Sequence, residues 1–382
     1  MKTRSIQLAE VLTIDRTAAS DGDCRTLPYV GLEHIEKDTG HFAEDFRQKP
    51  EILLATKYRF THRHVLYGKL RPNLNKTVLP DFDGVCTTEI LPLLAHPQTL
   101  DRGYLYGALL SKPFVKWATN NVSGANLPRL DPDRLLEYEI ELPDLSEQQR
   151  IAAQLQQADR LRRSRRHALE FTDTFLPAAF LELFGDPLSN IGGWATQILD
   201  TCCERFIDYR GRTPEYSSEG IPHVTSTCIK EHEIQWAAAK YVTDATYVSY
   251  MTRGLPARGD VILTTEAPLG ESAVIKTDDR FSVAQRLLLI RPGLSILPDY
   301  LCHLLSHRSF RPRLLQFATG STVKGISSES FRAIPIALPP LPIQQKFAAL
   351  VEHVERLRAA QREALRQAEH LFASLLDRAF EG

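Results

Sequence analysis

The sequence predicts an α+β protein built from two tandem copies of one mixed domain, each followed by a long helix. Two observations predict this class. The stretch Leu142-Pro-Asp-Leu-Ser-Glu-Gln-Gln-Arg-Ile-Ala152 returns, with substitutions, as Leu338-Pro-Pro-Leu-Pro-Ile-Gln-Gln-Lys-Phe-Ala348, 196 positions later. Each copy also begins with short β-rich runs mixed with helical stretches and ends in a segment of helical periodicity. A repeat of this length indicates a duplicated domain rather than a solenoid turn.

The same offset aligns residues along most of the chain. It pairs Val65 with Val261, Tyr104 with Tyr300, Phe114 with Phe310, Gly124 with Gly320 and Phe184 with Phe380. We therefore expect a first domain over 1–145, a first helical spacer over 146–186, a second domain over 187–341 and a second helical spacer over 342–382.

Composition limits the class of protein. With 382 residues and 43% hydrophobic content, the chain can bury two cores of ordinary size. The net charge of −1 gives no hint of a polyanionic partner, so an argument for nucleic acid must come from local clusters. The six cysteines form no C-x-x-C pair, which favours reduced thiols in a cytosol. No signal-peptide pattern or membrane-length apolar run is present, so we expect a soluble, cytoplasmic protein without a membrane partner.

In the first domain, short β-rich runs cover His64–Tyr67 and Val85–Leu91, and a helical stretch covers Tyr104–Trp117. Ser146-Glu-Gln-Gln149 has the pattern of a capping box and predicts the start of the first long helix. In the second copy Pro342 suits a first helical turn. Pro177 predicts a kink near the end of the first helix.

The long helices carry a seam in alternating steps of three and four residues, which is typical of a coiled coil. In the second helix the predicted seam is Phe347, Leu350, Val354, Leu357, Gln361, Ala364, Ala368, Leu371 and Leu375. In the first helix it is Ile151, Gln154, Ala158, Leu161, Arg165, Ala168, Thr172, Phe175 and Ala179, with polar interruptions. We expect each helix to pair with the other copy; the alternative is that each lies on its own domain.

Catalytic motifs are missing from the sequence. It has no phosphate loop, no G-x-G-x-x-G, no H-E-x-x-H and no Asp/Asn-Pro-Pro-aromatic tetrapeptide of amino-group DNA methyltransferases. His62-x-His64 offers two metal ligands, but no cysteine or carboxylate stands at metal-site spacing beside it. We therefore expect no catalytic residue, no metal and no cofactor.

Local charge is more informative. Between Lys49 and Leu79 there are seven cations and one acid, with aromatic and amide side chains between them. Such a segment suits a nucleic-acid surface, because Lys and Arg attract phosphate and Arg can read base edges. The alternative is a solvated basic loop. A second cluster, Arg162-Arg-Ser-Arg-Arg166, lies on the first helix, where the charged outer face of a coiled coil is the simpler interpretation.

Polar loops punctuated by Gly and Pro follow in the second copy at Asp208–Pro214, Thr264–Gly270 and Gly320–Ile326. Such loops present side chains from a rigid scaffold. The last aligns at the same offset with Gly124–Leu130, where the residues differ. Equivalent loops with different residues are what two different sequence readers would have.

On these features the chain resembles the specificity subunits of type I restriction-modification systems over nearly its whole length. The resemblance rests on the two domains with their helices, Leu-Pro-x-Leu-x-x-Gln-Gln before each helix, Phe184-Gly-Asp-Pro187 after the first, Gly259–Gly270 and Gly320–Ile326. It implies two target recognition domains that each read half of a split, asymmetric site in double-stranded DNA, and an antiparallel coiled coil that sets the spacing. It also implies that two methyltransferase subunits dock, that a restriction subunit can join, and that this subunit is not itself an enzyme.

With this resemblance, the candidate DNA-binding residues are Arg59, Tyr67, Lys69, Arg71, Lys76, Asn126, Arg129, Arg210, Arg212, Thr265, Glu266 and Lys324. Arg71 suits a bidentate contact with guanine, whereas Lys57 and Lys76 suit phosphate. The alternative within the same class is the specificity subunit of a methylation-only or other multisubunit DNA-modification or phage-defence system. Rival hypotheses from other classes are an enzyme with an unrecognised site and a coiled-coil assembly protein without a nucleic-acid role.

Overall fold

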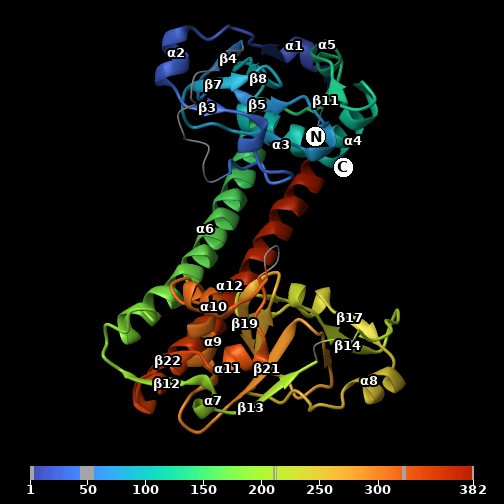
Figure 1. Ribbon diagram of the computed structural model, residues 1–382. Coiled ribbons are helices and arrows are strands. Elements are labelled where there is room, and N and C mark those ends of the chain that lie inside the picture. Colours follow the sequence, from blue (N-terminus) through green and yellow to red (C-terminus); the bar gives the residue numbers. More distant parts are fainter. Residues whose placement is uncertain (1–3, 44–55, 210, 212, 321–323, 381–382) are drawn as a thin grey trace. The chain divides into compact units, whose positions relative to one another are not determined.

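The computed structural model describes residues 4–43, 56–209, 211, 213–320 and 324–380. The chain folds as two compact units, and the boundary between them falls inside both long helices. The first unit contains 1–167 and 362–382, and the second contains 168–361. Each unit thus holds one mixed domain, part of α6 (Leu145–Phe184) and part of α12 (Leu341–Phe380) (Figure 1).

Two small sheets form the centre of the domain in the first unit, with strand orders β2-β8-β5-β6 and β3-β7-β4. Its strands are β1 (Arg4–Gln7), β2 (Leu12–Ile14), β3 (Tyr29–Val30), β4 (Lys57–Phe60), β5 (Val65–Gly68), β6 (Thr77–Val78), β7 (Gly84–Thr87), β8 (Ile90–Ala95), β9 (Val122–Ser123), β10 (Arg129–Leu130) and β11 (Glu139–Leu142). Its helices besides α6 are α1 (Leu8–Val11), α2 (Asp21–Thr26), α3 (Arg102–Leu110), α4 (Lys112–Asn120) and α5 (Pro132–Leu136). The expected single helix over 104–117 is split at Ser111, whose extended backbone ends α3 and begins α4.

The second unit repeats this plan, with strand orders β13-β21-β18-β19 and β17-β14-β20. Its strands are β12 (Ala195–Ile198), β13 (Cys203–Asp208), β14 (Ile221–Val224), β15 (Ile229–Lys230), β16 (Glu233–Ile234), β17 (Lys240–Val242), β18 (Val261–Thr265), β19 (Leu269–Val274), β20 (Ser282–Val283), β21 (Leu287–Pro292) and β22 (Pro335–Leu338). Its other helices are α7 (Leu199–Cys202), α8 (Asp244–Tyr250), α9 (Pro298–Ser306), α10 (Arg311–Phe317) and α11 (Ser328–Arg332). The mixed α+β class and the duplication are therefore confirmed.

The long helices run antiparallel in each unit. In the first unit the Arg162 guanidinium lies 3.8 Å from the ring centre of Phe372, and Arg166 lies 3.8 Å from Glu369. In the second unit Phe180 packs edge to face on Phe347, with ring centres 5.5 Å apart. Residue numbers rise on one helix as they fall on the other, so the expected pairing between the copies is confirmed. α6 continues as a helix through Pro177.

The predicted seam is wrong by one residue at several positions. On α12 the buried residues beyond its first turn are Phe347, Val351, Val354, Arg358, Ala368 and Phe372, whereas the predicted Leu357 and Leu371 are 43% and 44% exposed. α6 shows the same shift by one residue: Leu155, Arg162 and Leu176 are buried in place of Gln154, Leu161 and Phe175. Within each unit, both helices pack against the domain of that unit as well as against each other, so the buried face differs from the purely apolar stripe.

The start of each long helix is fixed by a buried glutamine. Gln148 is fully buried; its Oε1 accepts from the Asp101 N–H at 2.8 Å, and its Nε2 donates to the carbonyls of Thr99 and Pro143 at 3.0 and 2.9 Å. Gln344 makes the equivalent bonds in the second unit: its Oε1 accepts from the Leu297 N–H at 2.8 Å, and its Nε2 donates to the carbonyls of Ser295 and Pro339 at 3.1 and 2.7 Å.

The expected capping box at Ser146 is not the cap that forms. α6 begins one residue earlier, at Leu145, and Asp144 accepts from the Glu147 N–H at 2.9 Å and from the Ser146 hydroxyl at 2.6 Å. The carboxylate is the stronger acceptor for a free amide at a helix start, so it takes the position expected for the serine.

Candidate nucleic-acid interface

A junction of three segments in the first unit gathers several of the predicted DNA-binding residues. The segment after β5 pairs with the segment that enters β10, through an isolated bridge between Leu70 and Arg129. The Leu130 N–H donates to the Lys69 carbonyl at 2.9 Å, and the Arg71 N–H donates to the Pro128 carbonyl at 2.7 Å. The third segment is the turn between β7 and β8, whose Glu89 carbonyl accepts from the Lys69 N–H at 3.0 Å. We call these segments, 69–71, 87–90 and 124–130, the first junction.

The second unit builds the same junction 196 positions later. Glu266 bridges Gly325, as Leu70 bridges Arg129, and the Ile326 N–H donates to the Thr265 carbonyl at 3.0 Å. The Thr265 N–H donates to the carbonyl of Arg286, in the turn between β20 and β21, at 3.0 Å. The described parts of 265–267, 284–287 and 319–326 form what we call the second junction. The bridge and the bond to the Thr265 carbonyl match the first junction, the acceptor in the turn is one residue further along than the repeat offset gives, and the side chains differ.

Each junction carries one ion pair between arginine and glutamate. In the first, Arg129 Nε lies 3.0 Å from Glu89 Oε2, and Arg129 Nη1 donates to the Leu127 carbonyl at 3.2 Å. In the second, Arg286 Nε lies 2.8 Å from Glu266 Oε1. Glu89 and Arg286 were not among the expected residues. The repeat offset links positions in the two copies, but it cannot identify partners within one copy, so the sequence offered no signal for either pair.

Two of the expected cations in the first junction are well placed for a ligand. Arg71 is exposed, and its guanidinium has no ion-pair or hydrogen-bond partner within the described part of the chain. Its backbone has a φ of 52°, and this left-handed turn ends the extended segment that follows β5. Lys69 is half-buried beside it, and Asn126 is exposed on the facing loop.

Other expected residues lie elsewhere. Tyr67 is a core residue packed edge to face on Phe114, with ring centres 5.5 Å apart, so its side chain is not on the surface. Lys76 Nζ donates to the Leu32 carbonyl at 2.6 Å, and Lys57 is buried with its ammonium 5.7 Å from the ring centre of Tyr29. Each of these lysines is therefore occupied inside the first unit.

The remaining expected residues fall into three groups. Arg59 is exposed on β4, and its guanidinium lies 3.8 Å from the Asp23 carboxylate. Thr265 is buried, whereas Lys324 is exposed in the second junction. Arg210 and Arg212 lie outside the described residues.

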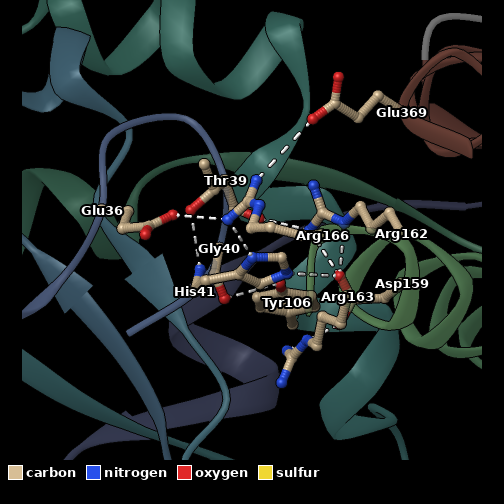
Figure 2. Close-up of polar contacts among 10 residues, drawn as sticks. All are labelled: Glu36, Thr39, Gly40, His41, Tyr106, Asp159, Arg162, Arg163, Arg166 and Glu369. Carbon is tan, nitrogen blue, oxygen red and sulfur yellow. Dashed lines mark hydrogen bonds and ion pairs between the residues drawn. The ribbon is translucent and has the colours of Figure 1, made fainter. Parts of the chain in front are cut away.

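The basic cluster on α6 makes contacts inside the first unit, and of its arginines Arg163 is exposed. Arg162 is buried and donates from Nε to Asp159 at 2.6 Å, and Arg163 lies 2.7 Å from the same carboxylate. Arg166 donates to Glu36 at 2.9 Å, and His41 Nε2 lies 2.9 Å from Asp159 (Figure 2). These contacts fix the segment from Glu36 to His41 to the helix.

The protonation of His41 follows from its two neighbours. Arg166 has only donors, so the Nδ1 atom of His41, 3.1 Å away, accepts, and Nε2 carries the proton that is donated to Asp159. Burial lowers the pKa of His41, and the charges of Arg162 and Arg163 lower it further. Burial alone would raise the pKa of Asp159, but the hydrogen bond from His41 and the two arginines lower it to about 2. The cluster therefore holds a neutral imidazole on a carboxylate anion.

The equivalent place in the second unit has a histidine cluster. Arg358 is buried, pairs with Asp173 of α6 and lies 3.8 Å from Glu231. His232 stacks on His303 with ring centres 4.1 Å apart. Burial lowers the pKa of His232 to about 4, with a further contribution from the charge of Arg358.

The His62-x-His64 pair does not form a metal site with its neighbours. His62 Nδ1 lies 3.0 Å from Asp83, and His64 Nε2 lies 3.3 Å from Asp15, so each ring has its own carboxylate. Within the described ranges no group of three or more His, Cys, Asp or Glu side chains could hold a metal ion.

No helix of the described part is both long and apolar enough to cross a membrane.

The described residues thus form a duplicated α+β domain with paired long helices and a polar junction in each unit. Comparison with known proteins agrees. The family model described as "Type I restriction modification DNA specificity domain" matches residues 49–170 and 215–368. The chain therefore belongs to the family of type I restriction-modification DNA specificity proteins.

Individual relatives are more distant. The chain is 28% identical over 160 residues to the specificity subunit of the type I restriction enzyme EcoDI of Escherichia coli, a match that covers 40% of this chain and 35% of the relative. The match thus spans about a third of that relative. Among solved structures, the S subunit of a type I system from M. genitalium aligns over 100% of this chain and 96% of its own, with a TM-score of 0.63 and 13% identity. A chain from a structural study of complex assembly and conformational transition of the type I system aligns over 99% and 97%, with a TM-score of 0.59 and 22% identity. These structures support the fold.

Proposed function

We propose that the chain is the DNA-reading subunit of a type I restriction-modification complex and that it reads a split, asymmetric site in double-stranded DNA. Residues 1–145 and 187–341 act as target recognition domains, and 146–186 and 342–382 act as helical spacers. One observation carries the proposal: both units build a junction with the same isolated bridge and the same hydrogen bond, from Leu130 to Lys69 and from Ile326 to Thr265, and present different side chains on it. A repeated frame with different contacts suits two unlike half-sites.

The proposed DNA surface is formed by the exposed and half-buried polar side chains of the junctions. In the first unit these are Lys69, Arg71, Asn126 and Arg129, with Arg59 on β4 nearby in sequence; in the second they are Glu266 and Lys324. Tyr67, Lys76 and Thr265 are left out because their side chains are buried or held inside the unit.

We further propose that the subunit is not an enzyme and that two methyltransferase subunits dock on it, with a restriction subunit able to join. The exposed apolar residues of the helices support this stoichiometry. The first unit exposes Leu161 and Leu371, and the second exposes Leu357 and Phe175, at 40–44% of their surface. The two sets are related by the repeat offset, so they offer one kind of partner two equivalent apolar surfaces. Because the assembled complex would act on DNA inside the cell, we propose that it is located in the cytoplasm.

Mass measurement of the assembled complex tests the stoichiometry. We expect two methyltransferase subunits per chain at saturation. A complex that remains one to one with excess methyltransferase would contradict the proposal. Replacing Leu161 and Leu371 together by Ser should remove one methyltransferase, whereas Leu188→Ser, a change at an exposed leucine outside the helices, should leave both bound.

A selection experiment tests the reading function. The chain, alone and with its methyltransferase partner, is mixed with a pool of random 50-base-pair duplexes, and the retained DNA is sequenced. The proposal expects a motif with two fixed parts and an unspecified gap. An enzyme with an unrecognised site, or an assembly protein without a nucleic-acid role, would enrich no such motif.

A methylation-only or other DNA-modification system remains the alternative within the same class. It would give the same split motif, so a second readout is needed. Assembly with a restriction subunit, followed by a test for cleavage of unmethylated DNA that carries the motif, separates the two: the alternative predicts methylation without cleavage.

A further inference from the structure

We propose that each junction presents one positioned arginine that reads a guanine: Arg129 in the first unit and Arg286 in the second. Glu89 and Glu266 act as the positioning residues. The inference rests on the proposed function and deepens it, because it names the side chains that set one base of each half-site.

The first observation is how the two arginines are held. Arg129 Nε lies 3.0 Å from Glu89 Oε2 and 3.2 Å from Oε1, and its Nη1 also reaches the Leu127 carbonyl at 3.2 Å. Arg286 Nε lies 2.8 Å from Glu266 Oε1. In both cases the glutamate carboxylate contacts Nε of the arginine. Nη2 has no partner within the described part of the chain for either arginine.

The second observation is that the two pairs lie in equivalent junctions although their members come from different segments. In the first unit the arginine comes from the loop position that Gly325 takes in the second, and the acid comes from the turn between β7 and β8. In the second unit the arginine comes from the turn between β20 and β21. The acid is Glu266, whose Oε2 would lie 3.2 Å from a Cβ at position 325. Two different sets of residues thus place an arginine–glutamate pair at equivalent junctions.

The chemistry of a guanidinium explains what such an arrangement can do. The side chain is a planar fork that pairs in bidentate fashion with the O6 and N7 acceptors of guanine in the major groove. A carboxylate on Nε restricts the rotamers of the arginine before DNA arrives, which lowers the entropy cost of binding. The arginine side chains are 40% and 52% exposed, against 27% and 35% for their glutamates, so the acids are the more buried partners.

The competing interpretation is that the two pairs only tie loops together. Exposed ion pairs contribute little to stability, about 0–1 kcal/mol. That interpretation predicts small stability changes and unchanged base preference. The two interpretations therefore differ in a measurable readout.

The experiment repeats the duplex selection with the full chain and its methyltransferase partner. Arg129→Ala should abolish the preference for guanine at one position of one half-site, a loss of about 5- to 150-fold in discrimination, and leave the other half-site unchanged. Arg286→Ala should do the same in the other half-site. Arg129→Lys keeps the charge but lacks the fork, so it should lose the guanine preference as well.

The positioning residues need a separate readout. Glu89→Ala should weaken the preference at the same position that Arg129→Ala abolishes, and Glu89→Gln should restore part of it, because an amide oxygen still accepts from Nε. The matched controls are arginines in exposed ion pairs away from the junctions: Arg134→Ala, which breaks the pair with Glu137, and Arg332→Ala, which breaks the 2.7 Å pair with Asp200. Both controls should leave the motif intact.

The outcomes are distinct. If the wild-type complex enriches no split motif, the proposed function fails, and this inference fails with it. If the wild type enriches a split motif but Arg129→Ala, Arg129→Lys and Arg286→Ala all enrich the same motif as the controls, the proposed function stands and the guanine assignment is overturned.

Discussion

Gln148 and Gln344 show how one repeated residue builds the same joint in both units. Each is fully buried and satisfies three backbone groups, whereas the residue that follows, Gln149 or Gln345, is exposed. The repeated Gln-Gln motif thus contains one residue that fixes the helix start and one that faces solvent. A sequence pattern alone does not separate the two.

Replacing the buried glutamine should destabilise one unit at a time. Gln148→Ala leaves three backbone groups without partners, and we expect a loss of at least about 2 kcal/mol in the free energy of unfolding of the first unit. Gln344→Ala should do the same to the second. Denaturant unfolding combined with hydrogen exchange measures the change and locates it. Gln149→Ala and Gln345→Ala are the controls; similar losses in them would show that the buried bonds are not the cause.

Arg71 and Lys69 are expected to make two different kinds of DNA contact. Arg71→Ala should cost about 1–3 kcal/mol of binding and relax one half-site only, because a guanidinium can read a base edge. Lys69→Ala should weaken binding to all sequences and reduce the log–log salt slope by roughly one, because an ammonium neutralises a phosphate. Lys69 replaces Lys76 in this role, since the Lys76 ammonium is bonded to the Leu32 carbonyl.

Titration of binding against salt, with selected and scrambled duplexes, checks both effects. If Lys69→Ala altered base preference while Arg71→Ala changed only the salt slope, the two roles would be reversed. If neither variant changed binding, the segment from β5 to β6 would be a solvated basic loop.

Among the elements, the two long helices show where a periodic pattern misleads. The expected stripe through Leu357 and Leu371 is apolar, yet the structure buries Arg358 and Phe372 instead. Arg358 can be buried because Asp173 and Glu231 neutralise it, and these partners lie far away in sequence. Helix periodicity therefore predicted the helices and their pairing, but not the face they bury, which depends on contacts that only the folded chain brings together.

The loop between β15 and β16 should make the second unit sensitive to acid. His232 has a folded-state pKa of about 4, below the unfolded value of 6.5, chiefly because of burial and then the charge of Arg358. Its contribution to stability is therefore complete above pH 6.5 and is lost as the pH falls from 6.5 through 4, by up to about 3 kcal/mol. Burial also lowers the pKa of its stacked neighbour His303.

His232→Asn tests this expectation, because asparagine tolerates the positive φ of 63° at that position. The variant should lose less stability than the wild type between pH 6.5 and 4 in denaturant unfolding. His353→Asn, at an exposed histidine of α12, is the matched control and should follow the wild type. A wild-type curve that stays flat over this range would count against a neutral buried histidine.

For the whole molecule, the duplication and the two long helices were predictable from the sequence, because the two copies can be aligned with each other at a fixed offset. The ends of α6 and α12 differ by the repeat offset at both termini. The junctions were partly predictable: the loops could be matched, but the ion pairs Arg129–Glu89 and Arg286–Glu266 could not, since no offset or period relates their members. Burial of Tyr67 was also missed, because an aromatic residue within a basic run suits a core and a DNA surface equally.

If the helices set the spacing of the half-sites, shortening both should change only that spacing. Removing seven residues from matching positions of α6 and α12 keeps the seam in phase and shortens each by roughly 10 Å, or about three base pairs. The methylated motif should keep both half-sites and lose about three positions from its gap, as read by sequencing of methylated DNA. Removing four residues from each breaks the seven-residue phase and should disrupt assembly. A gap of unchanged length after the seven-residue deletion would rule out the spacer role.

The division of the chain also fixes the order in which it can fold as it is made. The second unit is one continuous stretch, 168–361, so all its residues are present once Gln361 has left the ribosome. The first unit needs Phe372 of α12 for its core, and this residue is made later. The part of the chain that is translated first therefore completes its fold last. Until then, the face of the first domain that receives Phe372 stays open, and transiently exposed apolar surface of this kind favours aggregation.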